Sequence, residues 1–445
     1  MTDSIAGSPF WDVTFDKDGD PDTRTTDALL AETGNLTDLY VFSHGWNNEH
    51  RTARRLYDAF FGELGRQLTA DPRGTAGLAG VYWPSKLWSD EPIPDFTAAA
   101  APGGGGGVAA AGAGSGDTFV SEPALDEKTL ADLLDTFPDA KVPIERMAAL
   151  LKEREPTQQT LDDFFAGLAE FSARSGAGED DGEGAPARPG MLADPPNPVY
   201  ERYLAALTGS GAVIPGGDGA AGIGDRLKKL LHGAKEALRG ATYWEMKGRA
   251  GVVGRKGLGP LLGRIATQRP GLRVHLIGHS FGARLVSYAL DGLPSGVSPV
   301  KSVTLLQGAF SHFAFCSPLP FDAGRDGALG KRRQRVDGPL TVCFSSHDSA
   351  VGRFYPLASL AAGDATSAAR DALYRWGGMG ADGAQNPDAA LDGIKAAGAT
   401  YRFSKTRILN VDCSAVVRNG TAPSGAHSDI VHPEVTWIVL AGSRS

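Results

Sequence analysis

The chain has 445 residues, of which 42% are hydrophobic and 22% are charged. This composition excludes a fibrous or wholly disordered protein, and it suits one large domain with insertions better than several small domains. The formal net charge of −8 argues against a general nucleic-acid-binding surface, which requires clustered lysine and arginine.

The N-terminus carries no basic segment followed by an apolar stretch, and no apolar run approaches the length needed to span a bilayer. Cys316, Cys343 and Cys413 are far apart in the sequence and indicate neither a disulfide framework nor a metal site. We therefore expect a cytoplasmic protein with no stable membrane insertion, no nucleic-acid partner and no cofactor. The sequence says nothing about its oligomeric state.

Short apolar runs alternate with helical patterns along the chain. This alternation predicts an α/β protein with a mainly parallel sheet covered by helices on both faces. The ligand of such a sheet binds at the carboxyl ends of its strands. We expect strands at 10–15, 39–42, 79–83, 274–277, 300–306, 340–344 and 407–411, and helices at 52–68, 241–268 and 283–290.

Gly248, Gly251, Gly254 and Gly257 recur every three residues in the predicted helix 241–268. A glycine inside a helix costs about 1 kcal/mol relative to alanine, so the pattern requires a compensating gain. Because lysines and arginines interrupt this face, we interpret it as close packing on the sheet and not as a membrane-binding face.

A large insertion separates the strand at 79–83 from the strand at 274–277. Its Gly/Ala tract at 98–116, acidic Gly/Pro tract at 172–198 and third Gly-rich tract at 209–224 have compositions that do not hold one shape. Helical periodicity at 125–173 predicts either a cap over the active site or a decoration without a catalytic role. The predicted division is 1–90 and 241–445 for the α/β domain, with the partly disordered helical insertion at 91–240.

The strand at 274–277 leads into Gly278-His279-Ser280-Phe281-Gly282, and a helical pattern follows at 283–290. With 59 glycines in the chain, roughly half of one Gly-x-Ser-x-Gly is expected by chance, so the context decides its interpretation. Strand, sharp turn and helix are what a nucleophile elbow requires, because small residues must flank a strained, protruding serine. We predict Ser280 as the nucleophile.

A serine nucleophile needs a base within hydrogen-bond reach and an acid that orients the base. Asp348 follows the strand at 340–344, and His427 follows the last predicted strand, which gives the order serine, acid, histidine. We predict Asp348 as the acid, with Asp412 as the competitor, and His427 as the base. The other nearby histidines are His347, which could orient the acid loop, and His432, for which a capping or surface role is expected at the start of the terminal helix.

The tetrahedral intermediate also needs hydrogen-bond donors for its oxyanion. The strand at 39–42 ends in a His44-Gly45-Trp46 turn. The backbone amides of Trp46 and Phe281 are the predicted donors, and these amides impose no requirement on either side chain.

Several of these segments together resemble the α/β-hydrolase superfamily, and more closely a group of largely uncharacterised bacterial and fungal members. The resemblance covers about 40–90 and 240–445. It implies an α/β-hydrolase fold and a catalytic triad, but no substrate. The segments are Phe42-Ser43-His44-Gly45-Trp46, Gly278-His279-Ser280-Phe281-Gly282, Tyr243-Trp244-Glu245-Met246-Lys247, Arg249-Ala250-Gly251 and the stretch from Ser346 to Gly352 with Asp348, together with His427.

The sequence therefore predicts a serine hydrolase that acts like an esterase on a small acyl substrate. A lipase or an acyltransferase would use the same triad. The alternative from another class is a non-catalytic α/β-hydrolase scaffold whose insertion recruits a partner, since fold does not fix function.

Overall fold

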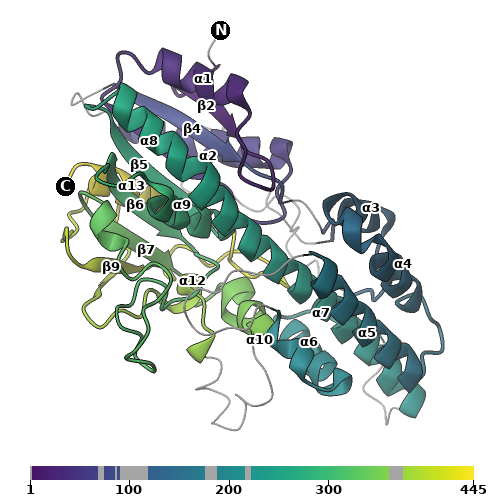
Figure 1. Ribbon diagram of the computed structural model, residues 1–445. Helices are drawn as coiled ribbons and strands as arrows, with labels where there is room; N and C mark the ends of the chain where they lie inside the picture. The colour runs from purple at the N-terminus through teal and green to yellow at the C-terminus, as the bar shows by residue number, and fades with distance from the viewer. Residues whose placement is uncertain are drawn as a thin grey trace.

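The structure is a computed structural model that describes residues 3–68, 75–85, 88–90, 119–175, 188–215, 222–359 and 374–445 (Figure 1). Its centre is a nine-stranded sheet in the order β1-β2-β4-β3-β5-β6-β7-β9-β8. All neighbouring pairs are parallel except β1 and β2, so the chain is confirmed as an α/β protein. The strands are β1 (Asp3–Ile5), β2 (Ser8–Thr14), β3 (Asp38–Ser43), β4 (Ala76–Tyr82), β5 (Arg273–His279), β6 (Val300–Leu306), β7 (Leu340–Phe344), β8 (Ala390–Gly393) and β9 (Ile408–Asp412).

Helices cover both faces of the sheet (Figure 1). Because successive side chains of a strand point to opposite faces, β3 contributes Leu39 and Val41 to the core on one face and Tyr40 and Phe42 to the core on the other. The first face is covered by α1 (Thr23–Glu32), α8 (Gly259–Gln268) and α9 (Phe281–Gly292), and the second by α2 (His50–Leu68) and α13 (Pro433–Ser443).

A second group of helices projects from one end of the sheet region (Figure 1). Within this group α5 and α6 pack on α7, α4 packs on α5, and α3 packs on α4, while α7 also packs on α9. The predicted boundary at residue 240 therefore falls inside one helix, and both regions share a continuous apolar core. The helices are α3 (Glu127–Thr136), α4 (Lys141–Leu150), α5 (Gln158–Ser175), α6 (Pro196–Gly209) and α7 (Ile223–Val252).

Two of the low-complexity tracts are more ordered than their composition suggests. The tract at 172–198 was expected to hold no single shape, yet α5 continues to Ser175 and α6 begins at Pro196. Met191 is buried in this tract and accepts a hydrogen bond from the Tyr203 hydroxyl at 3.2 Å, which explains how the end of the tract is anchored. In the tract at 209–224, Val213 bridges to Val120. The tract at 98–116, and residues 176–187 and 216–221 of the other two, lie outside the described residues.

The glycine-rich helix also differs in part from the expectation. It continues from α7 through a π-helical stretch at Val253–Leu258 into α8. A Cβ atom at Gly254 would lie 2.2 Å from the carbonyl oxygen of Leu285, which belongs to α9. The small residue thus permits close packing as predicted, but the contact at Gly254 is with the backbone of a helix and not with the sheet.

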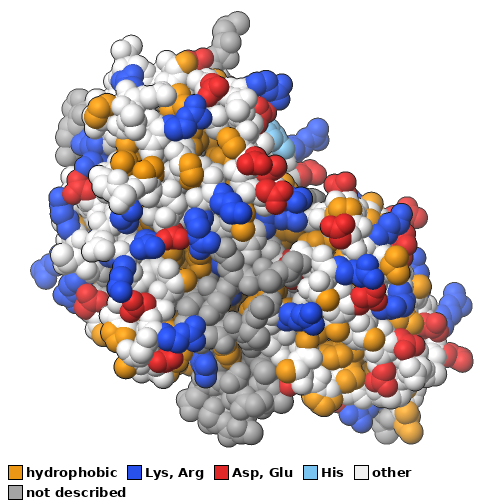
Figure 2. Space-filling view, viewed as in Figure 1, with side chains coloured by type: hydrophobic (Ala, Val, Ile, Leu, Met, Phe, Trp, Pro, Cys, Tyr) orange, Lys and Arg blue, Asp and Glu red, His pale blue; other side chains and the backbone are white. Residues whose placement is uncertain are grey.

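Basic and acidic side chains are interspersed over the face seen in Figure 2. In the basic stretch at 331–333, Lys331 pairs with Asp326 at 3.1 Å and Arg332 pairs with Asp291. Within the described part of the chain, no helix is both long and apolar enough to cross a membrane.

Candidate active site

Ser280 occupies the sharp turn between β5 and α9. Its backbone angles are φ 57° and ψ −124°, a conformation that costs a non-glycine residue about 1 to 3 kcal/mol. A Cβ atom at Gly278 would lie 2.5 Å from the Cα atom of Ala283, and one at Gly282 would lie 2.0 Å from the carbonyl oxygen of Ser43. Both glycines of the motif are therefore sterically required, which is the reason the elbow has its sequence.

His427 and Asp348 come together from two loops at the same edge of the sheet. The Nδ1 atom of His427 lies 2.7 Å from Oδ2 of Asp348, and Oδ1 of Asp348 accepts from the Val351 amide at 2.9 Å. The side chain of Asp348 has no exposed surface. Because a carboxylate accepts at Nδ1, the proton of the neutral imidazole is held there and Nε2 is left as the basic nitrogen.

The other candidate residues take structural positions. Asp412 accepts from the Ser414 amide at 2.9 Å and closes the turn after β9. His432 stands at the N-cap position of α13, where its imidazole is buried and its Nε2 lies 2.8 Å from Oδ1 of Asp429. A position at the helix start was expected for His432, but burial was not. The side chain of His347 is exposed, and only its carbonyl oxygen joins the two loops, by accepting from the Ala426 amide at 2.9 Å.

His279 is a site residue that the sequence did not indicate. Its Nε2 donates to the carbonyl oxygen of His427 at 2.8 Å, and the two imidazole centroids lie 4.9 Å apart. Burial, with a smaller contribution from His427, lowers the pKa of His279 to about 3. Burial likewise lowers the pKa of His44, just after β3, to about 4. Both imidazoles are therefore neutral near pH 7.

The turn after β3 lies against Ser280. A Cβ atom at Gly45 would stand 2.5 Å from Cβ of Ser280. The carbonyl group of Gly45 accepts from the Ser85 hydroxyl at 3.3 Å. In a trans peptide the following N–H points opposite to the carbonyl group. The amide of Trp46 is therefore directed away from Ser85. Phe281 is the first residue of α9, and a helix provides no internal acceptor for the amides of its first turn.

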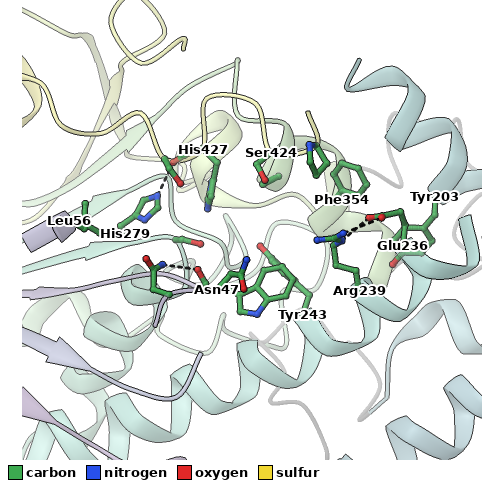
Figure 3. Close-up of a pocket in the computed structure, with 17 residues that line it drawn as sticks. Asn47, Leu56, Tyr203, Glu236, Arg239, Tyr243, His279, Phe354, Ser424 and His427 are labelled. Atoms are coloured by element: carbon green, nitrogen blue, oxygen red, sulfur yellow. Dashed lines mark hydrogen bonds and ion pairs between the residues drawn. The ribbon is translucent and has the colours of Figure 1, made fainter. Parts of the chain in front are cut away.

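A cavity of about 820 Å³, including its opening to solvent, lies beside these residues (Figure 3). One wall is a stripe on α7 with the spacing of a single helix face. The lining residues are Trp46, Asn47, Asn48 and Leu56 from the first half of the chain, Tyr203 from α6, Glu236, Arg239, Gly240 and Tyr243 from α7, His279 and Ser280 from the elbow, and Ala350, Phe354, Pro423, Ser424, His427 and Ser428 from the two loops.

The far end of this cavity contains buried charges. Arg239 donates from Nε to Glu236 and from Nη2 to Asp90, both at 2.9 Å, and Lys235 donates to Asp90 at 2.7 Å. Burial opposes ionisation of Asp90, but Arg239 and Lys235 outweigh it and lower its pKa to about 2. Burial raises the pKa of Glu236. The guanidinium of Arg239 also stacks on Trp88, with its carbon 4.3 Å from the ring centroid.

Among the described residues, no group of three or more His, Cys, Asp or Glu side chains is placed to hold a metal ion. Cys316, Cys343 and Cys413 are all buried free thiols. Comparison of the chain with protein families, with curated proteins and with solved structures finds no match. Function is therefore argued from the site itself.

Proposed function

We propose that the protein is a serine hydrolase of the α/β-hydrolase fold, which cleaves an ester or related acyl bond through an acyl-enzyme. The observation that carries this proposal is the 2.7 Å contact between His427 Nδ1 and Asp348 in a cavity that Ser280 and His427 both line. Ser280, Asp348 and His427 follow one another in the chain order of that fold. The cavity beside Ser280 also favours catalysis over a non-catalytic scaffold.

In this mechanism His427 acts as the base. Its Nε2 takes the proton of the Ser280 hydroxyl while Oγ forms a bond to the acyl carbon. The imidazolium, stabilised by Asp348, then gives this proton to the departing alkoxide, and the ester C–O bond breaks. Water repeats the sequence on the acyl-enzyme, which releases the acid and restores Ser280. The reaction requires no cofactor.

The amides of Trp46 and Phe281 are the proposed oxyanion donors. Gly45 brings the turn after β3 against Ser280, while Phe281 begins the helix that follows the nucleophile. Donors of this kind are worth about 3 to 4 kcal/mol each in the transition state, because they are fixed before charge develops. The partial positive charge at the start of α9 adds to the same field.

Labelling with a fluorophosphonate probe tests the proposal. The wild type is expected to react at Ser280, and the Ser280→Ala and His427→Ala variants to stay unlabelled. Ser287→Ala is the matched control, because Ser287 is buried within α9 and does not line the cavity. It should label as the wild type does. A folded wild type that does not react, or labelling that survives in Ser280→Ala, contradicts the proposal.

A further inference from the structure

The two ends of the cavity differ in chemistry. His279 and His427 lie at one end, and Arg239 and Glu236 lie at the other, with Tyr243 between them (Figure 3). Ser280, which directly follows His279, lines the same cavity. All three α7 residues project from one face of the helix. A substrate bound for attack by Ser280 can therefore extend along α7 towards the ion pair.

Aromatic side chains contribute to the middle of the cavity. The ring of Tyr243 lies 5.0 Å from that of Trp46 and 4.3 Å from that of Phe281, centroid to centroid. Phe354 and Pro423 line the cavity from the two loops. This surface favours an apolar segment of the substrate next to the reacting carbonyl.

Among the described residues, the far end is polar, and its two basic side chains are matched by two acidic ones. Lys235 and Arg239 are paired with Asp90 and Glu236, and the three α7 members of this cluster are at most 6% exposed. A further charge brought to a buried, balanced cluster remains uncompensated and pays its full desolvation cost. A methyl end would remove water from the ion pair without replacing its hydrogen bonds. A neutral group that both donates and accepts hydrogen bonds meets neither penalty.

We propose that the substrate is an ester with one arm, apolar along its length, that ends in a neutral polar group such as a carboxamide or hydroxyl, held by Arg239 and Glu236. This inference rests on the proposed function, because Ser280 defines the reacting end. If Arg239 and Glu236 hold the substrate, the helical insertion is part of the specificity site. Asp90 and the first half of α7 lie outside the segments that carry the triad.

The test uses activated aryl esters of graded chain length whose far end is a methyl, carboxamide, carboxylate or ammonium group. A second series carries the same ends on the alcohol arm. In one of the two series, short chains should show no preference, whereas chains long enough to reach Arg239 should show kcat/KM about tenfold higher for the carboxamide than for the methyl end. Both charged ends should be slower than the methyl end. The length threshold separates recognition at the far end from a general effect of polarity.

The double variant Glu236→Leu/Arg239→Met removes the ion pair and leaves Lys235 paired with Asp90. Apolar replacement of a whole buried pair is far less disruptive than removal of one partner. The carboxamide preference should reverse in favour of the methyl end, and the ratio within one variant cancels any change shared by all substrates. The control Arg146→Met/Glu170→Leu, which removes a pair between α4 and α5, should keep the wild-type ratio.

Equal rates for all ends at every length, or a carboxamide preference that survives in the double variant, overturns the inference while the serine hydrolase proposal stands. If no ester is cleaved, the catalytic proposal is the one that fails. The shift in Tm when the same esters bind to Ser280→Ala then tests recognition at the far end of the cavity independently of catalysis. The carboxamide ester should raise Tm more than its methyl counterpart, and the reverse order overturns the inference.

Discussion

The imidazole of His279 donates from Nε2 to the carbonyl oxygen of His427 at 2.8 Å. A carbonyl oxygen only accepts, so this bond fixes the tautomer of His279. The pKa of about 3 keeps that imidazole neutral near pH 7. His279 thus ties the main chain of the proposed base to the residue before the proposed nucleophile, and it is a positioning residue in the proposed mechanism.

Replacing His279 by alanine is expected to lower kcat by up to about 100-fold, because small displacements of a catalytic group have effects of that size. KM should change little, since the reacting groups and not the far end of the pocket are disturbed. His279→Gln retains an N–H donor and should recover part of kcat. Kinetics on a short aryl ester measure both values. If His279→Ala lowers Tm but leaves kcat of the folded enzyme at the wild-type value, His279 is only structural.

Asp348→Asn is expected to lower kcat by about 10⁴-fold. The amide leaves the shape of the site intact but no longer fixes the proton on Nδ1 of His427, so Nε2 is not held as the base. Pre-steady-state labelling with a fluorophosphonate measures the same loss without a substrate. Asp412→Asn is the control, since the Asp412 carboxylate accepts from the Ser414 amide and hydroxyl in the turn after β9, and it should retain activity within about threefold. Equal losses in the two variants would contradict the assignment of the acid.

Gly282→Ala is expected to destabilise the fold by at least about 1 to 3 kcal/mol, the usual cost of overpacking. Its added carbon would meet the main-chain oxygens of Ser43 and His44 at 2.0 and 2.5 Å, and backbone does not move aside as a flexible side chain does. Urea denaturation measures the free energy of unfolding. Gly271→Ala, where no atom lies within 4 Å of the new carbon, should stay within about 0.5 kcal/mol of wild type.

The parts of the fold that the sequence predicted are those with strong local patterns. β6 and β7 coincide with the predicted ranges, because both are short segments rich in apolar and β-branched residues, and Pro299 and Pro339 directly precede them. β8 was missed, since its sequence Ala-Leu-Asp-Gly is short and half exposed. The first half of α7 was missed as well, because glycine-rich sequence precedes it and its polar residues are stabilised by partners far away in the chain.

The candidate site likewise has features that the sequence predicted and features that it did not. The elbow and the loop positions of Asp348 and His427 follow from strand ends that are visible in the sequence. The contact of His279 with His427 joins residues 148 positions apart, and that of Arg239 with Asp90 joins residues 149 apart. No local pattern encodes such contacts. They arise only when the sheet brings its strand ends together and α7 is laid beside them.

The buried carboxyl group of Glu245 is expected to make the free energy of unfolding depend on pH. This α7 carboxyl is 8% exposed, and burial raises its pKa from 4.5 to about 8, against the opposing effects of Ser175 and Arg249. Because the folded state binds this proton more tightly than the unfolded chain, the contribution is fully present below about pH 4.5 and is lost as pH rises through about 8. Glu245→Gln keeps the neutral form at every pH. It should therefore raise the free energy of unfolding at high pH by up to about 4 kcal/mol relative to wild type, and change it little at low pH. Urea denaturation across this range measures the difference, and a constant offset between the two proteins at all pH values would contradict the prediction.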